Sequence, residues 1–152
     1  MIKLTSTLFF ATLIIACNSH DKKEESPGSK ESTRQAKSPV NCYRYATNSD
    51  TVNLKLIHVG KSITGTLVYN LKEKDKNIGT IQGSMRGNVL IADYTFMSEG
   101  VQSVRQVAFK LEGNSFVEGY GESYDSAGKM IFKNVDSLAF GSDLKLAEID
   151  CQ

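Results

Sequence analysis

The chain has 152 residues, of which 40% are hydrophobic and 23% charged, and its formal net charge is +1. Its 18 basic and 17 acidic side chains nearly balance, so it lacks the basic character of proteins that bind nucleic acid. The histidines, His20 and His58, and the three cysteines match no zinc-binding spacing. Nucleic acid is therefore excluded as a partner, and we expect no cofactor.

The first residues have the features of an export signal. Lys3 precedes a mostly apolar stretch over residues 4–16. A helix that spans a bilayer needs about 20 apolar residues, so this stretch is too short and is typical of the h-region of a signal peptide. A buried core helix is the alternative, but residues 18–40 that follow it have almost no apolar content. We expect residues 1–16 to be a signal peptide.

Residues Ile14-Ile15-Ala16-Cys17 resemble the lipobox of bacterial lipoproteins. The resemblance implies cleavage before Cys17, attachment of diacylglycerol to its thiol and acylation of the new N-terminus. The segment departs from the family pattern at Ile14, where leucine is commoner, and at Ile15, where a smaller residue is commoner. More than one acyl chain anchors a protein stably, so Cys17 would tether the protein to a membrane of the bacterial cell envelope.

The residue after the cysteine bears on which membrane is expected. Asn18 stands where an aspartate is the familiar retention signal for the inner membrane in enterobacteria, so the outer membrane is expected, on its periplasmic or its surface face. The run over residues 21–25 loosely resembles the acidic export signal of surface lipoproteins in Bacteroidetes-type bacteria, although two lysines interrupt it. The alternative is a solvated tether.

Residues 17–40 contain both prolines and one large apolar residue, Val40. Such a stretch cannot bury enough surface to order itself, so we expect a flexible, lipid-anchored linker. Residues 41–152 are enough for one core. Cys42 and Cys151 stand at the two ends of this domain, and an even pair in an exported protein predicts a disulfide. The alternative is two free thiols.

Apolar residues alternate with period two over residues 43–133, which predicts strands. We expect strands near 41–46, 51–59 and 62–70, a four-stranded meander over 79–122, another strand at 129–133 and a candidate at 136–140. Residues 141–149 could form a helical turn or a short strand. The expected two-residue turns are Gly60-Lys61, Gly87-Asn88, Glu99-Gly100 and Gly113-Asn114.

Two-residue turns fix which residues face one another on adjacent strands. Three consecutive hairpins then share one apolar face, and Gly65, Gly79 and Gly83 on that face would let strands bend. The predicted fold is all-β: an antiparallel meander of about eight strands forming a small barrel or half-barrel, with a sandwich as the alternative. The predicted pairs include Leu54–Leu67, Leu56–Gly65, Ile81–Tyr94, Leu90–Phe109, Tyr94–Arg105, Phe109–Glu118, Val107–Tyr120 and Arg105–Glu122.

This geometry resembles that of lipocalins and other calycin-type barrels. The chain has no tryptophan, so it lacks the Gly-x-Trp signature of true lipocalins. The resemblance therefore concerns architecture, which by itself implies little about function.

Charged residues are predicted on the apolar face. Arg105 would lie opposite Glu122 with the Tyr94 hydroxyl beside them, and Glu118 would lie beside Phe109. One interpretation is a satisfied ion pair near the barrel rim. The other is the mouth of a pocket for a small ligand, because an apolar interior with a few convergent polar groups is typical of such sites. The candidate ligand-binding residues are Tyr94, Arg105, Glu118, Tyr120 and Glu122.

No catalytic motif is found. The segment GSMRG over residues 83–87 has its serine in the wrong place for a nucleophile elbow. Glu118 and Glu122 would lie about 13 Å apart along a strand, too far for a glycosidase pair. We therefore expect a protein that is not an enzyme.

Two functional hypotheses remain. The first is a domain that binds a small apolar or amphipathic ligand on its inner face. It requires a cavity of ligand size inside the domain. A ligand could not bind there if the interior were filled by six apolar side chains: Leu54, Leu56, Ile81, Leu90, Val107 and Phe109. The second is a structural or protein-interaction module of the envelope, using apolar residues of the opposite face: Ile78, Ile91, Met97 and Val104.

Overall fold

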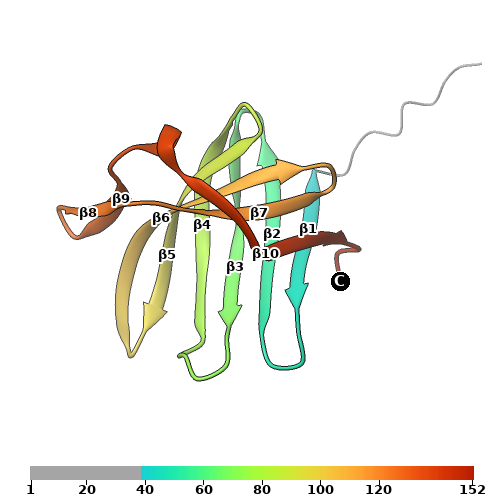
Figure 1. Cartoon of the computed structure of the whole chain (residues 1–152), viewed down its shortest axis with the longest axis horizontal. Coiled ribbons are helices and arrows are strands. Elements are labelled where there is room, and N and C mark those ends of the chain that lie inside the picture. Colours follow the sequence, from blue (N-terminus) through green and yellow to red (C-terminus); the bar gives the residue numbers. More distant parts are fainter. Residues whose placement is uncertain (1–38) are drawn as a thin grey trace, which may run out of the picture. The chain divides into compact units, whose positions relative to one another are not determined.

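The computed structural model describes residues 39–152, which are almost entirely β-structure (Figure 1). The predicted signal peptide, the lipidation site at Cys17 and most of the predicted linker lie outside these residues. Within residues 39–152, no helix is long and apolar enough to cross a membrane. The described elements are β1 (Val40–Ala46), β2 (Thr51–Val59), β3 (Ser62–Asn70), β4 (Asn77–Arg86), β5 (Val89–Ser98), β6 (Val101–Glu112), β7 (Ser115–Tyr120), β8 (Ser123–Ser126), β9 (Lys129–Phe132), the 3-10 turn η1 (Val135–Ser137) and β10 (Ala139–Ile149).

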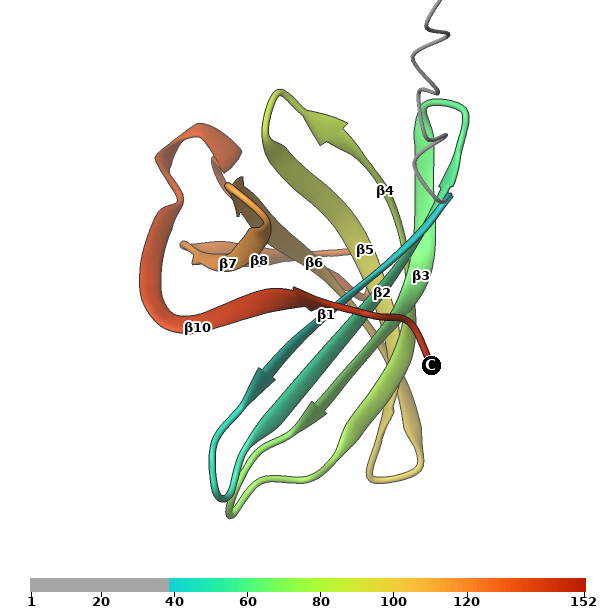
Figure 2. The same ribbon diagram turned by 90° about the vertical axis from the view of Figure 1, so that its right-hand side faces the viewer.

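Eight of the strands form a closed antiparallel barrel. Strands β1 to β7 follow one another around the ring, and β10 closes it by pairing with both β7 and β1. In the view of Figure 1, β7 and β10 run across β1 to β4, and Figure 2 shows the ring from the side. The hairpin of β8 and β9 lies outside the ring, and β9 pairs in parallel with β6. The predicted all-β barrel is thus confirmed.

The four predicted turns occur where the sequence places them. Backbone φ is positive at Gly60, Gly87 and Gly113, and at both residues of the Glu99-Gly100 turn, as tight hairpins that match the strand twist require. The predicted pairings of the first three hairpins are found, including Leu54 with Leu67, Ile81 with Tyr94 and Tyr94 with Arg105.

Glycines on the inner face allow neighbouring strands to approach closely. A Cβ atom at Gly65 would lie 1.8 Å from the carbonyl oxygen of Lys55, and one at Gly83 would lie 2.1 Å from that of Ile91. No side chain fits in these gaps. The strands can therefore coil sharply enough here to close a small barrel.

The barrel interior is filled by apolar side chains over much of its length. Each of the six residues whose burial would count against an interior ligand site is at most 3% exposed: Leu54, Leu56, Ile81, Leu90, Val107 and Phe109. Leu146 of β10 is also fully buried in this core. A ligand in the middle of the barrel is therefore ruled out, and any ligand site must lie toward an end or a side.

The strand pairing predicted from the sequence is wrong at the end of β7. The pairing of β7 with β6 ends at Gly119, opposite Ala108, so the predicted pairs of Tyr120 with Val107 and of Glu122 with Arg105 are wrong. Gly119 pairs with Phe140 of β10, and a Cβ at Gly119 would lie 2.5 Å from the Phe140 ring. The ring occupies the space that the glycine leaves open, and β7 stays with β10 while β9 takes its place beside β6.

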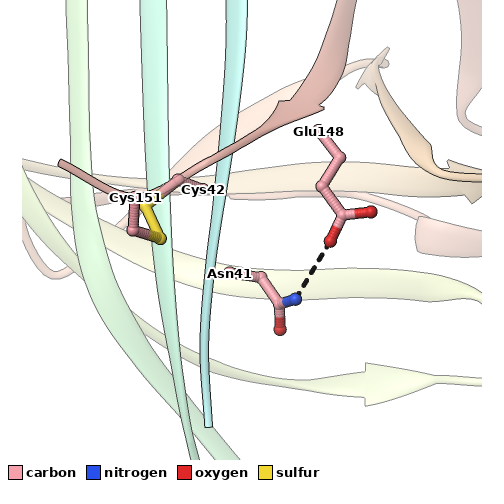
Figure 3. The surroundings of a disulfide bond; sticks show 4 residues. All are labelled: Asn41, Cys42, Glu148 and Cys151. Carbon is pink, nitrogen blue, oxygen red and sulfur yellow. Dashed lines mark hydrogen bonds between the residues drawn. A yellow bond between two sulfur atoms is a disulfide. The ribbon is translucent and has the colours of Figure 1, made fainter. Parts of the chain in front are cut away.

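The predicted disulfide joins Cys42 of β1 to Cys151 just beyond β10, with Cα atoms 5.3 Å apart (Figure 3). Beside it, the Asn41 side-chain amide donates a hydrogen bond of 3.1 Å to Glu148 of β10. Residues 141–149, which the sequence left open between a helical turn and a strand, belong to β10. This strand has a register shift between Phe140 and Lys145.

Candidate functional site

A polar cluster lies inside the barrel, near the ends of β3 and β5. Tyr69 comes from β3, Tyr94 from β5, Arg105 from β6, and Glu118 with Tyr120 from β7. Alternation along each strand turns these side chains to the inner face, and the register sets Tyr94 directly opposite Arg105. The structure thus brings together four of the predicted site residues and adds Tyr69.

Glu118 is the buried acid of this cluster, with 5% of its surface exposed. The Tyr69 hydroxyl donates to its Oε1 at 2.6 Å, and the Tyr120 hydroxyl donates to its Oε2 at 3.0 Å. Burial raises the pKa of the Glu118 carboxyl, while the two hydrogen bonds and the charge of Arg105 oppose part of that shift. Both carboxylate oxygens therefore already have donors.

The three tyrosines of the cluster stay protonated at neutral pH. Burial raises the pKa of Tyr94 to about 12, against the opposing charge of Arg105. The pKa values of Tyr69 and Tyr120 are raised as well. Burial is the larger cause, and the negative charge of the neighbouring Glu118 is the second. The hydroxyl groups therefore act as hydrogen-bond donors: those of Tyr69 and Tyr120 donate to Glu118. That of Tyr94 is buried with no partner among the described residues.

Arg105 is a cation held among aromatic rings. Its guanidinium carbon lies 5.2 Å from the Tyr69 ring centre, 5.6 Å from that of Tyr94 and 5.5 Å from that of Phe96. Such contacts stabilise a cation through the negative faces of the rings. Its Nε atom is buried without a partner, and the guanidinium makes no hydrogen bond or ion pair with any residue of 39–152.

Glu122 does not belong to the cluster. It is exposed, and it pairs with Lys133 at 2.9 Å between Nζ and Oε2. The predicted ion pair of Arg105 with Glu122 is therefore wrong, because the chain leaves β6 before Glu122 is reached. Met130 of β9 lies opposite Arg105 instead.

A cavity of about 320 Å³ opens beside the cluster, between the barrel wall and the β8–β9 hairpin. Arg105, Glu118, Tyr120 and Ser123 give it a polar side, and Val107, Met130 and Phe132 give it an apolar side. The sequence predicted a strand at 129–133 but not its partner, so Met130, Phe132 and Ser123 were missed. A parallel pairing of only two residue pairs has no turn to fix its register.

Side-chain contacts dock the β8–β9 hairpin over this cavity. Lys129 forms an ion pair with Asp93 of β5. The backbone amide of Phe132 donates to the side-chain oxygen of Gln106 at 3.2 Å. The hairpin thus forms one wall of the cavity without being part of the ring.

Metal binding is not indicated in the described part of the chain. Within residues 39–152, no group of His, Cys, Asp and Glu side chains is arranged to hold a metal ion. Comparison of the chain with protein-family models, curated proteins and solved structures finds no significant match.

Proposed function

We propose that this protein is a lipid-anchored protein of the bacterial cell envelope whose barrel domain binds a small amphipathic molecule. The observation that carries the proposal is the cavity with one polar and one apolar side, next to an arginine whose Nε atom is buried without a hydrogen-bond partner. A few polar groups in a largely apolar concave site are the usual means of orienting a small ligand. Tyr94, Arg105, Glu118 and Tyr120 surround or support this site.

The size of the cavity limits the ligand. About 320 Å³ is at the small end of the range for ligand pockets, about 300–1,000 Å³. The filled core beyond the polar cluster leaves no depth for a long chain. The ligand is therefore a small molecule or the end of a larger one, with its remainder in solvent.

The envelope location follows from the start of the chain. The lipobox resemblance at Cys17 and the asparagine at position 18 support an anchor in the outer membrane. Growth with a labelled fatty acid tests the anchor: the wild-type chain takes up label, and Cys17→Ala does not. Label on the Cys17→Ala chain would contradict the lipid assignment.

The alternative is a protein-interaction module without a small ligand. Ile78 and Met97 are neighbours across β4 and β5 on the outer face, and they are 53% and 50% exposed. Ile91 and Val104, which would extend this surface, are half-buried. Only two of the four predicted surface residues thus remain open, which favours the ligand-binding proposal.

Native mass spectrometry of the full chain, purified from its host, separates these two functions. The proposal expects a small-molecule mass on the wild-type protein that is lost on denaturation. The matched variant Ile78→Ser should keep this mass, because Ile78 is on the outer face of the barrel, 53% exposed, and the polar cluster is on the inner face. A co-purified protein that Ile78→Ser releases, with no small molecule, would favour the alternative.

A further inference from the structure

We infer that the ligand of this cavity has an acidic headgroup, a carboxylate or a phosphate, which binds Arg105. The inference rests on the proposed function and specifies the chemical class of the ligand. It comes from asking which hydrogen-bonding groups of the cluster are already used and which are not.

The acceptors of the cluster are used. Glu118 carries the only carboxylate on the cavity wall, and its two oxygens accept hydrogen bonds from Tyr69 and Tyr120 within the described residues. Each oxygen thus already has one donor, and the carboxyl is only 5% exposed, which leaves little room for an ammonium head beside it. A cationic head is therefore disfavoured.

Two donors of the cluster, the Arg105 guanidinium and the Tyr94 hydroxyl, are not used by other residues of 39–152. A guanidinium has five N–H groups in a planar fork that matches the oxygens of a carboxylate or phosphate. None of those of Arg105 is bonded to a residue of 39–152, and its Nε is buried. The Tyr94 hydroxyl, from the residue opposite Arg105, is also buried without an acceptor.

An unpaired, partly buried cation is costly unless an anion or a dipole accompanies it. Three aromatic rings offset part of this cost for Arg105. Contacts of this kind act on the ring faces and leave the N–H groups of the guanidinium without acceptors. The site thus has unused N–H donors on Arg105, and the oxygens of an acidic group would accept hydrogen bonds from them.

The apolar side of the cavity determines how the ligand is oriented. Arg105 is on the inner face beside the filled core, whereas Met130 is 43% exposed on β9 at the mouth. An acid on Arg105 would therefore point inward, and the apolar part would run outward along Met130 and Phe132. The head is bound and the tail is partly solvated.

A matched series of six-carbon probes tests the headgroup. Hexanoate, hexyl phosphate, hexanol and hexylamine are titrated calorimetrically into the full chain held in lipid nanodiscs, with protein-free nanodiscs as the blank. We expect hexanoate or hexyl phosphate to bind at least about tenfold more tightly than hexanol, as a hydrogen bond to a charged group implies. The stronger of the two acids identifies carboxylate or phosphate as the preferred head.

Substitution of Arg105 tests the residue. Arg105→Gln should lower the affinity for the acid to that for hexanol and leave hexanol binding unchanged. Arg44→Gln removes the same charge from an exposed position on β1 and should leave the acid preference intact. If Arg105→Gln does not fold, the probe series on the wild-type protein still decides the headgroup.

The outcomes separate the inference from the proposed function. Equal binding of hexanol and the acids overturns the acidic headgroup but leaves a small-ligand site in place. Tighter binding of hexylamine also overturns it. Binding of none of the four probes overturns the proposed function itself, while an acid preference that survives Arg105→Gln in a folded protein overturns the role of Arg105.

Discussion

Tyr69 and Glu118 hydrogen-bond across the barrel, with 2.6 Å between the Tyr69 hydroxyl and Glu118 Oε1. Their strands, β3 and β7, are four places apart in the ring of eight, so they lie on opposite walls. A hydrogen bond between opposite walls links the two halves of the ring at the end where the apolar core stops.

Removing the Tyr69 hydroxyl should therefore destabilise the fold. We expect Tyr69→Phe to lower the free energy of unfolding by about 1–3 kcal/mol, because a buried carboxyl loses one of its donors. Urea unfolding of the full chain measures this. Tyr94→Phe is the matched control, since the Tyr94 hydroxyl has no partner among the described residues, and it should cost nothing. Equal losses in the two variants would show that the cross-barrel hydrogen bond does not stabilise the protein.

Glu118 should make stability depend on pH. Its folded pKa is raised from 4.5 by burial, so its contribution favours folding below the unfolded pKa and is lost as the pH rises through the folded pKa. The free energy of unfolding of the wild type, relative to Glu118→Gln, should fall as the pH rises above 4.5. Urea unfolding at several pH values tests this.

A second acid supplies the control for the sign of this effect. The hydrogen bond and charge of Lys110 lower the pKa of the exposed Glu112. The wild type relative to Glu112→Gln should therefore lose stability as the pH falls, and only slightly, because solvent screens exposed pairs. The same direction of change for both acids would contradict the assignment for Glu118.

The sequence predicts the barrel well because short turns transmit information along the chain. Once the Gly87-Asn88 and Glu99-Gly100 turns are placed, every pair of the two hairpins follows, and Tyr94 opposite Arg105 is one of them. A slip of one residue would turn the apolar set outward. Gly65, which the register places on the inner face, likewise indicates from the sequence that the strands can bend.

The candidate site is predicted less completely because it depends on contacts that no turn fixes. Extending the register of β7 beyond Gly119 set Glu122 opposite Arg105, but Phe140 holds β7 to β10 at this point. The parallel strand that replaces it, β9 with Met130 beside Arg105, is itself part of the hairpin outside the ring. Tyr69 was missed because its partner is across the barrel rather than on a neighbouring strand.

The disulfide should contribute much of the stability. Cys42 and Cys151 are 109 residues apart, and closing a loop of about 100 residues is expected to stabilise a fold by about 2–5 kcal/mol. We expect the double variant Cys42→Ala/Cys151→Ala to lose this amount in urea unfolding. Reductant should weaken the wild type to the same extent and leave the double variant unchanged. If reductant that has full access to the unfolded wild-type chain leaves its free energy of unfolding unchanged, the two cysteines are free thiols.

Gly65 should not tolerate a side chain. A Cβ there would lie 1.8 Å from the carbonyl oxygen of Lys55, and relieving such overlap costs about 1–3 kcal/mol or more. We expect Gly65→Ala to lower the thermal midpoint strongly. Gly141→Ala is the control, because a Cβ at Gly141 meets no atom within 4 Å. A normal midpoint for Gly65→Ala would mean that β2 and β3 are farther apart.

The β8–β9 hairpin should open more readily than the ring. It is held to β6 by two parallel residue pairs and to β5 by the ion pair of Lys129 with Asp93. Weakly docked segments open locally at low free energy, so amides of residues 123–132 should exchange hydrogen faster than those of β2 to β5. Hydrogen exchange read by mass spectrometry measures this difference.

The ion pair of Lys129 with Asp93 should set the rate of that opening. Because a partly exposed pair contributes up to about 1 kcal/mol, Lys129→Ala should speed exchange in the hairpin by up to about fivefold. Lys72→Ala removes a similar but more exposed pair with Glu73 and should have no effect there.

A bound acid on Arg105 would contact Met130 and slow the exchange of β9. Slow exchange of the hairpin amides in the wild type, Lys129→Ala and Lys72→Ala would mean that the hairpin is a fixed wall of the cavity. Ligands would then enter without opening of the hairpin.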